Sequence, residues 1–151
     1  MTRILLDTMC GGLRPYLRMC GHDTVYSLDR DVEADDELLR IAREEDRLLV
    51  TRDEGLAARA EPSLLLRSLD VEDQLRELRD AGIDLALDDE PTYCGRCNGR
   101  LERVDDERDP PEYVPDPLPD RLWRCRDCGQ YFWKASHWDD VAETLASLKE
   151  P

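Results

Sequence analysis

Two Cys-x-x-Cys pairs constrain this chain more than any other feature of its sequence. Cys94 and Cys97 form the first pair, Cys125 and Cys128 form the second, and a stretch of roughly thirty residues separates them. Four thiolates at this spacing are typical of a zinc ribbon, in which a tetrahedral Zn²⁺ stabilises a small fold. Because a closed four-thiolate site leaves no open coordination position, we expect any catalysis elsewhere in the chain.

The length and the change in composition near residue 90 predict two modules. A chain of 151 residues can hold one medium domain and a small appendage. We predict a first domain over residues 1–90 and a zinc ribbon with a C-terminal helix over residues 91–151. Zinc binding explains how the shorter part folds with little hydrophobic core of its own.

The charge of the chain is strongly negative. It has 36 acidic and 21 basic residues and a net charge of -15, which repels a polyanion unless positive charge is locally concentrated. Lysine occurs only at Lys134 and Lys149, and aspartate outnumbers glutamate, a composition that suggests a halophilic protein in a salty cytoplasm. At 1 M salt the Debye length is about 3 Å, so the net charge does not exclude RNA as a partner.

The cysteine usage indicates a reducing, cytoplasmic location. The six cysteines occur without a secretory signal, and four of them have metal-ligand spacing. We expect the other two, Cys10 and Cys20, to be small apolar residues in or near the core rather than redox groups. No apolar run approaches the ~20 residues that span a bilayer, so we expect no membrane partner.

The first ninety residues alternate between short apolar runs and amphipathic segments. Runs at 3–7, 24–28, 47–51 and 63–66 read as strands, and apolar residues recur at helical spacing within 13–19, 38–42 and 71–81, with a short helix near 56–57. This order predicts an α/β fold with a mostly parallel sheet covered on both faces. Beyond a linker at 84–90 we expect a proline-rich extended insertion at 105–120, a strand at 130–133 and a closing helix at 139–148.

Three aspartates are placed to meet at one edge of that sheet. Asp7 and Asp53 follow strands, and Asp35 begins the helix after the second strand, so all three open on the carboxyl edge of the sheet. Such oxygen ligands suit Mg²⁺ or Mn²⁺, and two ions about 3.5 to 4 Å apart can support phosphodiester hydrolysis by water. The alternative is ordinary turn and cap chemistry in an acid-rich chain.

Arginines and aromatic residues offer contacts to nucleic acid. Arg14 and Arg18 share one helix face and Arg52 precedes Asp53, so these guanidinium groups can hold phosphate oxygens or, alternatively, pair with surface acids. Arginines are also frequent in the predicted ribbon. We expect its aromatic side chains either to stack on bases or to form the core of the ribbon. The aromatic residues concerned are Tyr131, Trp133 and Trp138.

The two histidines give no catalytic signal. Ser136 and His137 are adjacent and lack a specified partner acid, so they do not indicate a hydrolase dyad. We expect His137 to pack or hydrogen-bond at the ribbon edge and His22, beside Gly21, to be a turn residue.

Several motifs in order resemble the Mut-seven C-terminal ribonuclease family, over nearly the entire chain. They are Asp7-Thr8-Met9, Leu13-Arg14, Leu17-Arg18, Gly21-His22-Asp23-Thr24, Asp35-Asp36-Glu37-Leu38-Leu39, Ala42, Arg47, Leu49, Thr51-Arg52-Asp53, Cys94, Cys97-Asn98, Cys125, Cys128-Gly129 and Tyr131 to Trp138. The resemblance implies a PIN-like, three-layer nuclease domain followed by a zinc ribbon, with RNA as the substrate. It also implies that Asp7, Asp35 and Asp53 hold catalytic Mg²⁺ or Mn²⁺, with Asp36 as an ambiguous neighbour, and that Arg14, Arg18 and Arg52 occupy the basic positions.

These observations lead to a metal-dependent ribonuclease as the first hypothesis. The second is a non-catalytic RNA- or protein-binding module that uses the zinc ribbon. A third is an interaction partner of RNA-processing or ribosome-associated proteins.

Overall fold

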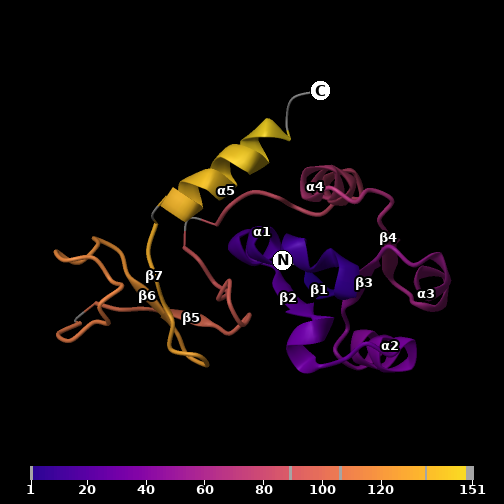
Figure 1. Ribbon diagram of the computed structural model, residues 1–151, viewed down its shortest axis with the longest axis horizontal. Coiled ribbons are helices and arrows are strands. Elements are labelled where there is room, and N and C mark those ends of the chain that lie inside the picture. The colour runs from indigo at the N-terminus through magenta and orange to yellow at the C-terminus, as the bar shows by residue number, and fades with distance from the viewer. Residues whose placement is uncertain (1, 89, 106, 135, 149–151) are drawn as a thin grey trace.

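The computed structural model describes residues 2–88, 90–105, 107–134 and 136–148. Strands β1 (Arg3–Leu6), β2 (Asp23–Tyr26), β3 (Leu48–Thr51) and β4 (Ser63–Leu65) form one sheet in the order β2-β1-β3-β4, and every pair is parallel (Figure 1). This confirms the predicted α/β fold with a parallel sheet.

The sheet lies between two helical layers. Ile4 and Leu6 face one layer, which contains α1 (Arg14–Met19), α4 (Val71–Asp80) and α5 (Ser136–Ser147). Leu5 faces the other, which contains α2 (Asp35–Glu44) and α3 (Glu54–Arg59). Because successive strand residues point to opposite faces, two separate cores form around a central sheet of continuous apolar runs.

Helix α2 begins at Asp35, as predicted, and the helices differ in how their first turns are capped. Asp53 and Asp70 are N-caps whose carboxylates accept from Leu56 N–H and Asp73 N–H. Helix α2 instead has Ala34 as N-cap without a side-chain cap, and Asp35 and its acidic neighbours occupy the first turn. There they still interact favourably with the helix dipole. Two 3₁₀ segments, η1 (Thr8–Leu13) and η2 (Ser27–Arg30), follow β1 and β2.

The C-terminal part forms a small antiparallel sheet of β5 (Leu101–Arg103), β6 (Trp123–Cys125) and β7 (Tyr131–Phe132), in that order. The proline-rich insertion contributes Val114 to its core, where Leu122 and Tyr131 are also buried. Tyr113 from the same insertion stacks on Trp133, with ring centroids 6.3 Å apart. The insertion therefore packs onto the ribbon.

Helix α5 returns to the parallel sheet. Val141, Leu145 and Leu148 pack into the same core cluster as Ile4 and Leu6, and Figure 1 shows α5 leaving the ribbon toward α1 and α4. The predicted division at residue 90 stays a prediction, but this helix belongs to the core of the parallel sheet. None of the helices in the described ranges is long and apolar enough to cross a bilayer.

Candidate functional site

The four paired cysteines converge on one point. The sulfur atoms of Cys94, Cys97, Cys125 and Cys128 all lie within 4.8 Å of one another, with Sγ–Sγ distances of 3.7 Å for Cys94–Cys128 and 3.5 Å for Cys97–Cys125. Tetrahedral Zn²⁺ with Zn–S bonds of about 2.3 Å requires sulfur separations of about 3.8 Å. The geometry therefore fits structural zinc.

Backbone amides support these sulfurs. Arg96 N–H points to Cys94 Sγ, Gly99 N–H to Cys97 Sγ, and the N–H groups of Asp127 and Cys128 to Cys125 Sγ, each at 3.4 Å. Donors aimed at sulfur stabilise thiolates, which are the metal-binding form of cysteine. Burial raises the pKa of Cys94 and Cys97, and these amides oppose that shift; at Cys125 they contribute to a lowered pKa.

Cys10 and Cys20 are separate from this centre. Both are buried in the core of the parallel sheet, and burial raises the pKa of each thiol to about 12. A thiol with so high a pKa is a poor nucleophile at neutral pH. This confirms the interpretation of both residues as small apolar core residues.

Asp7 and Asp53 follow neighbouring strands at the carboxyl edge of the sheet. Asp7 comes directly after β1 and accepts from Thr8 N–H at 2.7 Å, and Asp53 follows β3 and caps α3. Asp7 is half-buried, whereas Asp53 is exposed. Strands β1 and β3 are paired in parallel, so the two carboxylates lie at the same edge of the sheet.

Thr51 connects these two aspartates. Its hydroxyl donates to Asp7 Oδ2 at 2.7 Å and accepts from Asp53 N–H at 3.0 Å, and its side chain is fully buried. The last residue of β3 therefore fixes the carboxylate that follows β1. Thr51 belongs to the Thr51-Arg52-Asp53 motif of the family resemblance, but the sequence pattern gives it no role of its own.

Asp35 and Asp36 lie at the start of α2 and are exposed. Asp36 pairs with Arg59, with Oδ1 2.8 Å from the guanidinium. In the described ranges, the four cysteines are the sole group of three or more histidine, cysteine or acidic residues with ligand atoms within 4.8 Å of one another. Asp7, Asp35 and Asp53 therefore do not form such a close triad in this conformation.

The three predicted arginines have different surroundings. Arg14 donates to Gly11 O, lies 3.3 Å from Asp29 and covers the Tyr26 ring at 4.4 Å. Arg18 is 1% exposed and donates to Thr24 O and Gly95 O, so a role in substrate binding would require its guanidinium to leave these contacts. Burial lowers the pKa of Arg18, and Asp29 opposes that shift.

Arg52 carries an unpaired donor. Its Nε is buried and has no hydrogen-bond partner within the described residues. A buried N–H without an acceptor is unfavourable, and because this Nε has almost no exposed surface, a ligand could reach it only if neighbouring side chains moved. Of the three arginines, Arg52 is the one with an orphaned donor, and it lies between Thr51 and Asp53 in sequence.

The ribbon docks on the free edge of strand β2 through Asn98. Its Oδ1 accepts from Thr24 N–H at 2.8 Å, and its Nδ2 donates to Asp23 Oδ1 at 2.7 Å. Asn98 follows Cys97 with φ +70°, a left-handed conformation that asparagine tolerates better than most residues. The zinc knuckle therefore caps an exposed sheet edge, which protects it from pairing with other chains.

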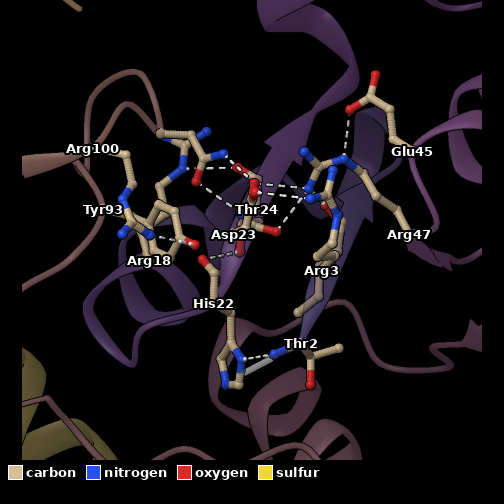
Figure 2. A network of polar contacts seen from close by, with 12 residues as sticks. Thr2, Arg3, Arg18, His22, Asp23, Thr24, Glu45, Arg47, Tyr93 and Arg100 are labelled. Atoms are coloured by element: carbon tan, nitrogen blue, oxygen red, sulfur yellow. Dashed lines mark hydrogen bonds and ion pairs between the residues drawn. The ribbon is translucent and has the colours of Figure 1, made fainter. Parts of the chain in front are cut away.

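Asp23 is the centre of a charged network at this edge. Arg47 donates to its Oδ1 at 2.9 Å and Arg3 lies 3.9 Å from its Oδ2, as Figure 2 shows. Burial raises the pKa of Asp23, but the hydrogen bonds from Asn98 and Arg47 outweigh that and lower the pKa overall. This carboxylate therefore stays ionised and ties the ribbon to the sheet.

His22 is buried and lies directly between the turn at Gly21 and strand β2. Its Nδ1 accepts from Thr2 N–H at 3.1 Å (Figure 2), and its Nε2 contacts Asp84 O at 2.6 Å. The ring thus joins the N-terminal strand to the segment after α4. The side chains of Ser136 and His137 lie outside the described part of the structure.

The family model of the Mut7-C RNAse domain matches the chain over residues 2–145. No curated protein and no solved structure gives a significant match. The matched range includes the parallel sheet, both cysteine pairs and most of α5. The chain therefore belongs to the Mut7-C RNAse domain family.

Proposed function

We propose that the protein is a metal-dependent ribonuclease that hydrolyses RNA phosphodiester bonds at the sheet edge carrying Asp7 and Asp53. The observation that carries this proposal is the link through Thr51, whose hydroxyl donates to the Asp7 carboxylate and accepts from the backbone N–H of Asp53 at the ends of paired strands. Ordinary helix capping does not require such a cross-strand link. The family description as an RNAse domain supports the same chemistry and RNA as the substrate.

The donor set suits Mg²⁺ or Mn²⁺. Carboxylate oxygens are hard ligands, and Mg²⁺ commonly uses one or two carboxylates while keeping several waters and contacting substrate phosphate. Asp7 and Asp53 keep free lone pairs beside the hydrogen bonds that orient them. When bound, the divalent ion would lower the pKa of water and stabilise charge on the phosphoryl oxygens. Asp35 and Asp36 stay predicted contributors that would act from the start of α2.

The arginine at the site can position the substrate. Arg52 is half-buried and directly precedes Asp53, and guanidinium groups bind phosphate with directional hydrogen bonds. Arg14 contributes positive charge on the neighbouring segment, where Asp29 partly neutralises it. With these groups orienting the phosphodiester, water is the attacking nucleophile.

The test is cleavage of labelled single-stranded RNA with Mg²⁺ or Mn²⁺ added or left out. Asp7→Asn and Asp53→Asn should each lower the rate at least about 100-fold, because a carboxylate ligand is lost. Asp80→Asn is the matched control, since Asp80 lies on the surface at the end of α4. Zinc content and melting temperature confirm that each variant is folded.

Two results would contradict the proposal. Full activity of purified Asp7→Asn would exclude the acidic site. RNA binding without cleavage, at any divalent ion concentration, would favour the non-catalytic binding module instead.

A further inference from the structure

An aromatic cavity of about 400 Å³ lies between the zinc ribbon and α1. All three tryptophans and the sole phenylalanine of the chain line it, together with two tyrosines. These residues are Tyr93, Trp123, Tyr131, Phe132, Trp133 and Trp138. The volume is within the range of small-ligand pockets, which starts at about 300 Å³.

The cavity has a buried floor and more accessible walls. Trp123 and Tyr131 are buried and belong to the ribbon core, as the core interpretation of the aromatic residues predicts. Phe132, Trp133 and Trp138 are only partly buried, so parts of their rings remain accessible. Accessible aromatic faces around a cavity are suited to stacking with a flat ring.

The charge of the lining differs from that of the whole protein. Arg96 and Lys134 line the cavity, and among the described residues no acidic side chain does, although the chain has 36 acidic and 21 basic residues. Arg96 donates to Gln130 Oε1 at 3.0 Å, and the Lys134 ammonium lies 4.8 Å from the Trp138 ring centroid. Local positive charge without carboxylates favours an anionic ligand.

Helix α1 connects the cavity to the acidic edge. Pro15 and Met19 of α1 form part of the cavity lining, whereas Arg14 of the same helix contacts Gly11 O in the segment after Asp7. Consecutive residues of a helix lie about 100° apart, so the cavity and Arg14 occupy adjacent faces of one helix. A strand of nucleic acid that crosses α1 can reach both places.

We propose that this cavity binds an unpaired base of single-stranded RNA by stacking, with Arg96 and Lys134 contacting its phosphates. The inference rests on the proposed ribonuclease function, for which it supplies a substrate-binding subsite away from Asp7 and Asp53. A neutral proline-rich peptide also fits aromatic grooves, but it would gain nothing from the two cations.

The tryptophans provide a direct measurement, because all three line the cavity. Short single-stranded RNA is titrated into the Asp7→Asn variant without added divalent ion, at fixed salt, and tryptophan fluorescence is followed. We expect quenching, and an abasic oligonucleotide of the same length should bind about 5- to 100-fold more weakly, because stacking contributes about 1–3 kcal/mol per base.

Substitutions of residues that line the cavity test whether RNA binds there. In the Asp7→Asn background, Trp138→Ala and Phe132→Leu should each weaken RNA binding about tenfold, and Arg96→Gln should also weaken it. Arg126→Gln is the matched control, because Arg126 is a ribbon arginine that pairs with Glu102 outside the cavity lining and should leave affinity unchanged. Phe132→Leu keeps an apolar side chain, so it tests stacking even where Trp138→Ala disturbs folding.

Three outcomes would overturn the inference: no quenching by RNA, equal affinity for the abasic oligonucleotide, or unchanged affinity in both aromatic variants. Quenching by a proline-rich peptide but not by RNA counts against it as well. Cleavage by the wild-type protein is measured separately. Cleavage of RNA without base-dependent binding would disprove only the base-binding subsite. Base-dependent binding without cleavage would disprove only the assignment as a nuclease.

Discussion

The hydroxyl of Thr51 donates a 2.7 Å hydrogen bond to Asp7 Oδ2, so the end of β3 holds the carboxylate that follows β1. The hydroxyl oxygen of Thr51 also accepts from Asp53 N–H, which places one buried hydroxyl between two acids that are far apart in sequence. Groups that orient a catalytic carboxylate commonly matter almost as much as the carboxylate itself.

Replacement of Thr51 by valine should therefore affect both activity and stability. The shape of the side chain is kept, but Asp7 loses a donor and Asp53 N–H loses its acceptor. We expect RNA cleavage to fall about 10- to 100-fold and the free energy of unfolding to fall by about 1–2 kcal/mol. Thr51→Ser keeps the hydroxyl and is the control. Wild-type cleavage rates in Thr51→Val would exclude an orienting role.

Replacement of Arg52 should mainly weaken RNA binding. Arg52→Lys keeps the charge but removes the unpaired Nε donor and the planar fork, so lysine should not restore full affinity. We expect about a tenfold weaker affinity for RNA, measured in the Asp7→Asn background. Arg40→Lys, on the exposed face of α2, is the control and should bind normally. Equal affinities of Arg52→Lys and Arg40→Lys would show that the Arg52 guanidinium is not a substrate contact.

Asn98 should couple the ribbon to the parallel sheet. Asn98→Gly removes both side-chain hydrogen bonds but tolerates φ +70°, so the free energy of unfolding should fall by about 2 kcal/mol. Asn98→Ala adds backbone strain of about 1 kcal/mol and should be less stable than the glycine variant. Chemical denaturation of the three proteins gives these differences. If glycine proves the more damaging substitution, backbone strain does not contribute at this position.

The Asp23 network predicts a pH dependence of stability. The folded-state pKa of Asp23 lies below its ordinary value, so its stabilising contribution is complete above about pH 4 and is lost as the pH falls through the lowered pKa. Asp23→Asn should be about 2 kcal/mol less stable than wild type at pH 7. The difference in stability between Asp23→Asn and wild type should become smaller in thermal melts recorded below pH 4. A difference in stability that does not change with pH would show that the negative charge of Asp23 does not stabilise the fold.

Zinc loss should unfold the ribbon. Chelation, or Cys125→Ser, removes the four-thiolate centre, and the binding energy of a structural zinc site is folding energy. We expect a lower melting temperature and a changed tryptophan emission, because all three tryptophans line the cavity formed in part by the ribbon. Cys10→Ser and Cys20→Ser should keep full zinc content by elemental analysis. Retention of structure after verified zinc loss would refute the structural role.

Much of the fold followed from local sequence patterns. The apolar runs around Leu5 and Leu49, buried on both faces of the sheet, predicted central parallel strands. The cysteine spacing predicted the metal centre because its ligands sit on two short, local knuckles. The predicted strands and helices differ from the observed ones by a few residues at their ends, as at 24–28 against Asp23–Tyr26, where the chain enters a 3₁₀ segment.

The sequence by itself determined the order of strands and helices, the thiolate centre and the placement of Asp7 and Asp53 at strand ends. These features depend on periodicity and spacing along the chain, which the sequence records directly. Tertiary structure decided that Thr51 joins the two acids, that Asn98 caps β2 and that Arg18 is buried between the sheet and the ribbon. Each of these contacts depends on which side chains from distant segments meet, and no local pattern specifies that.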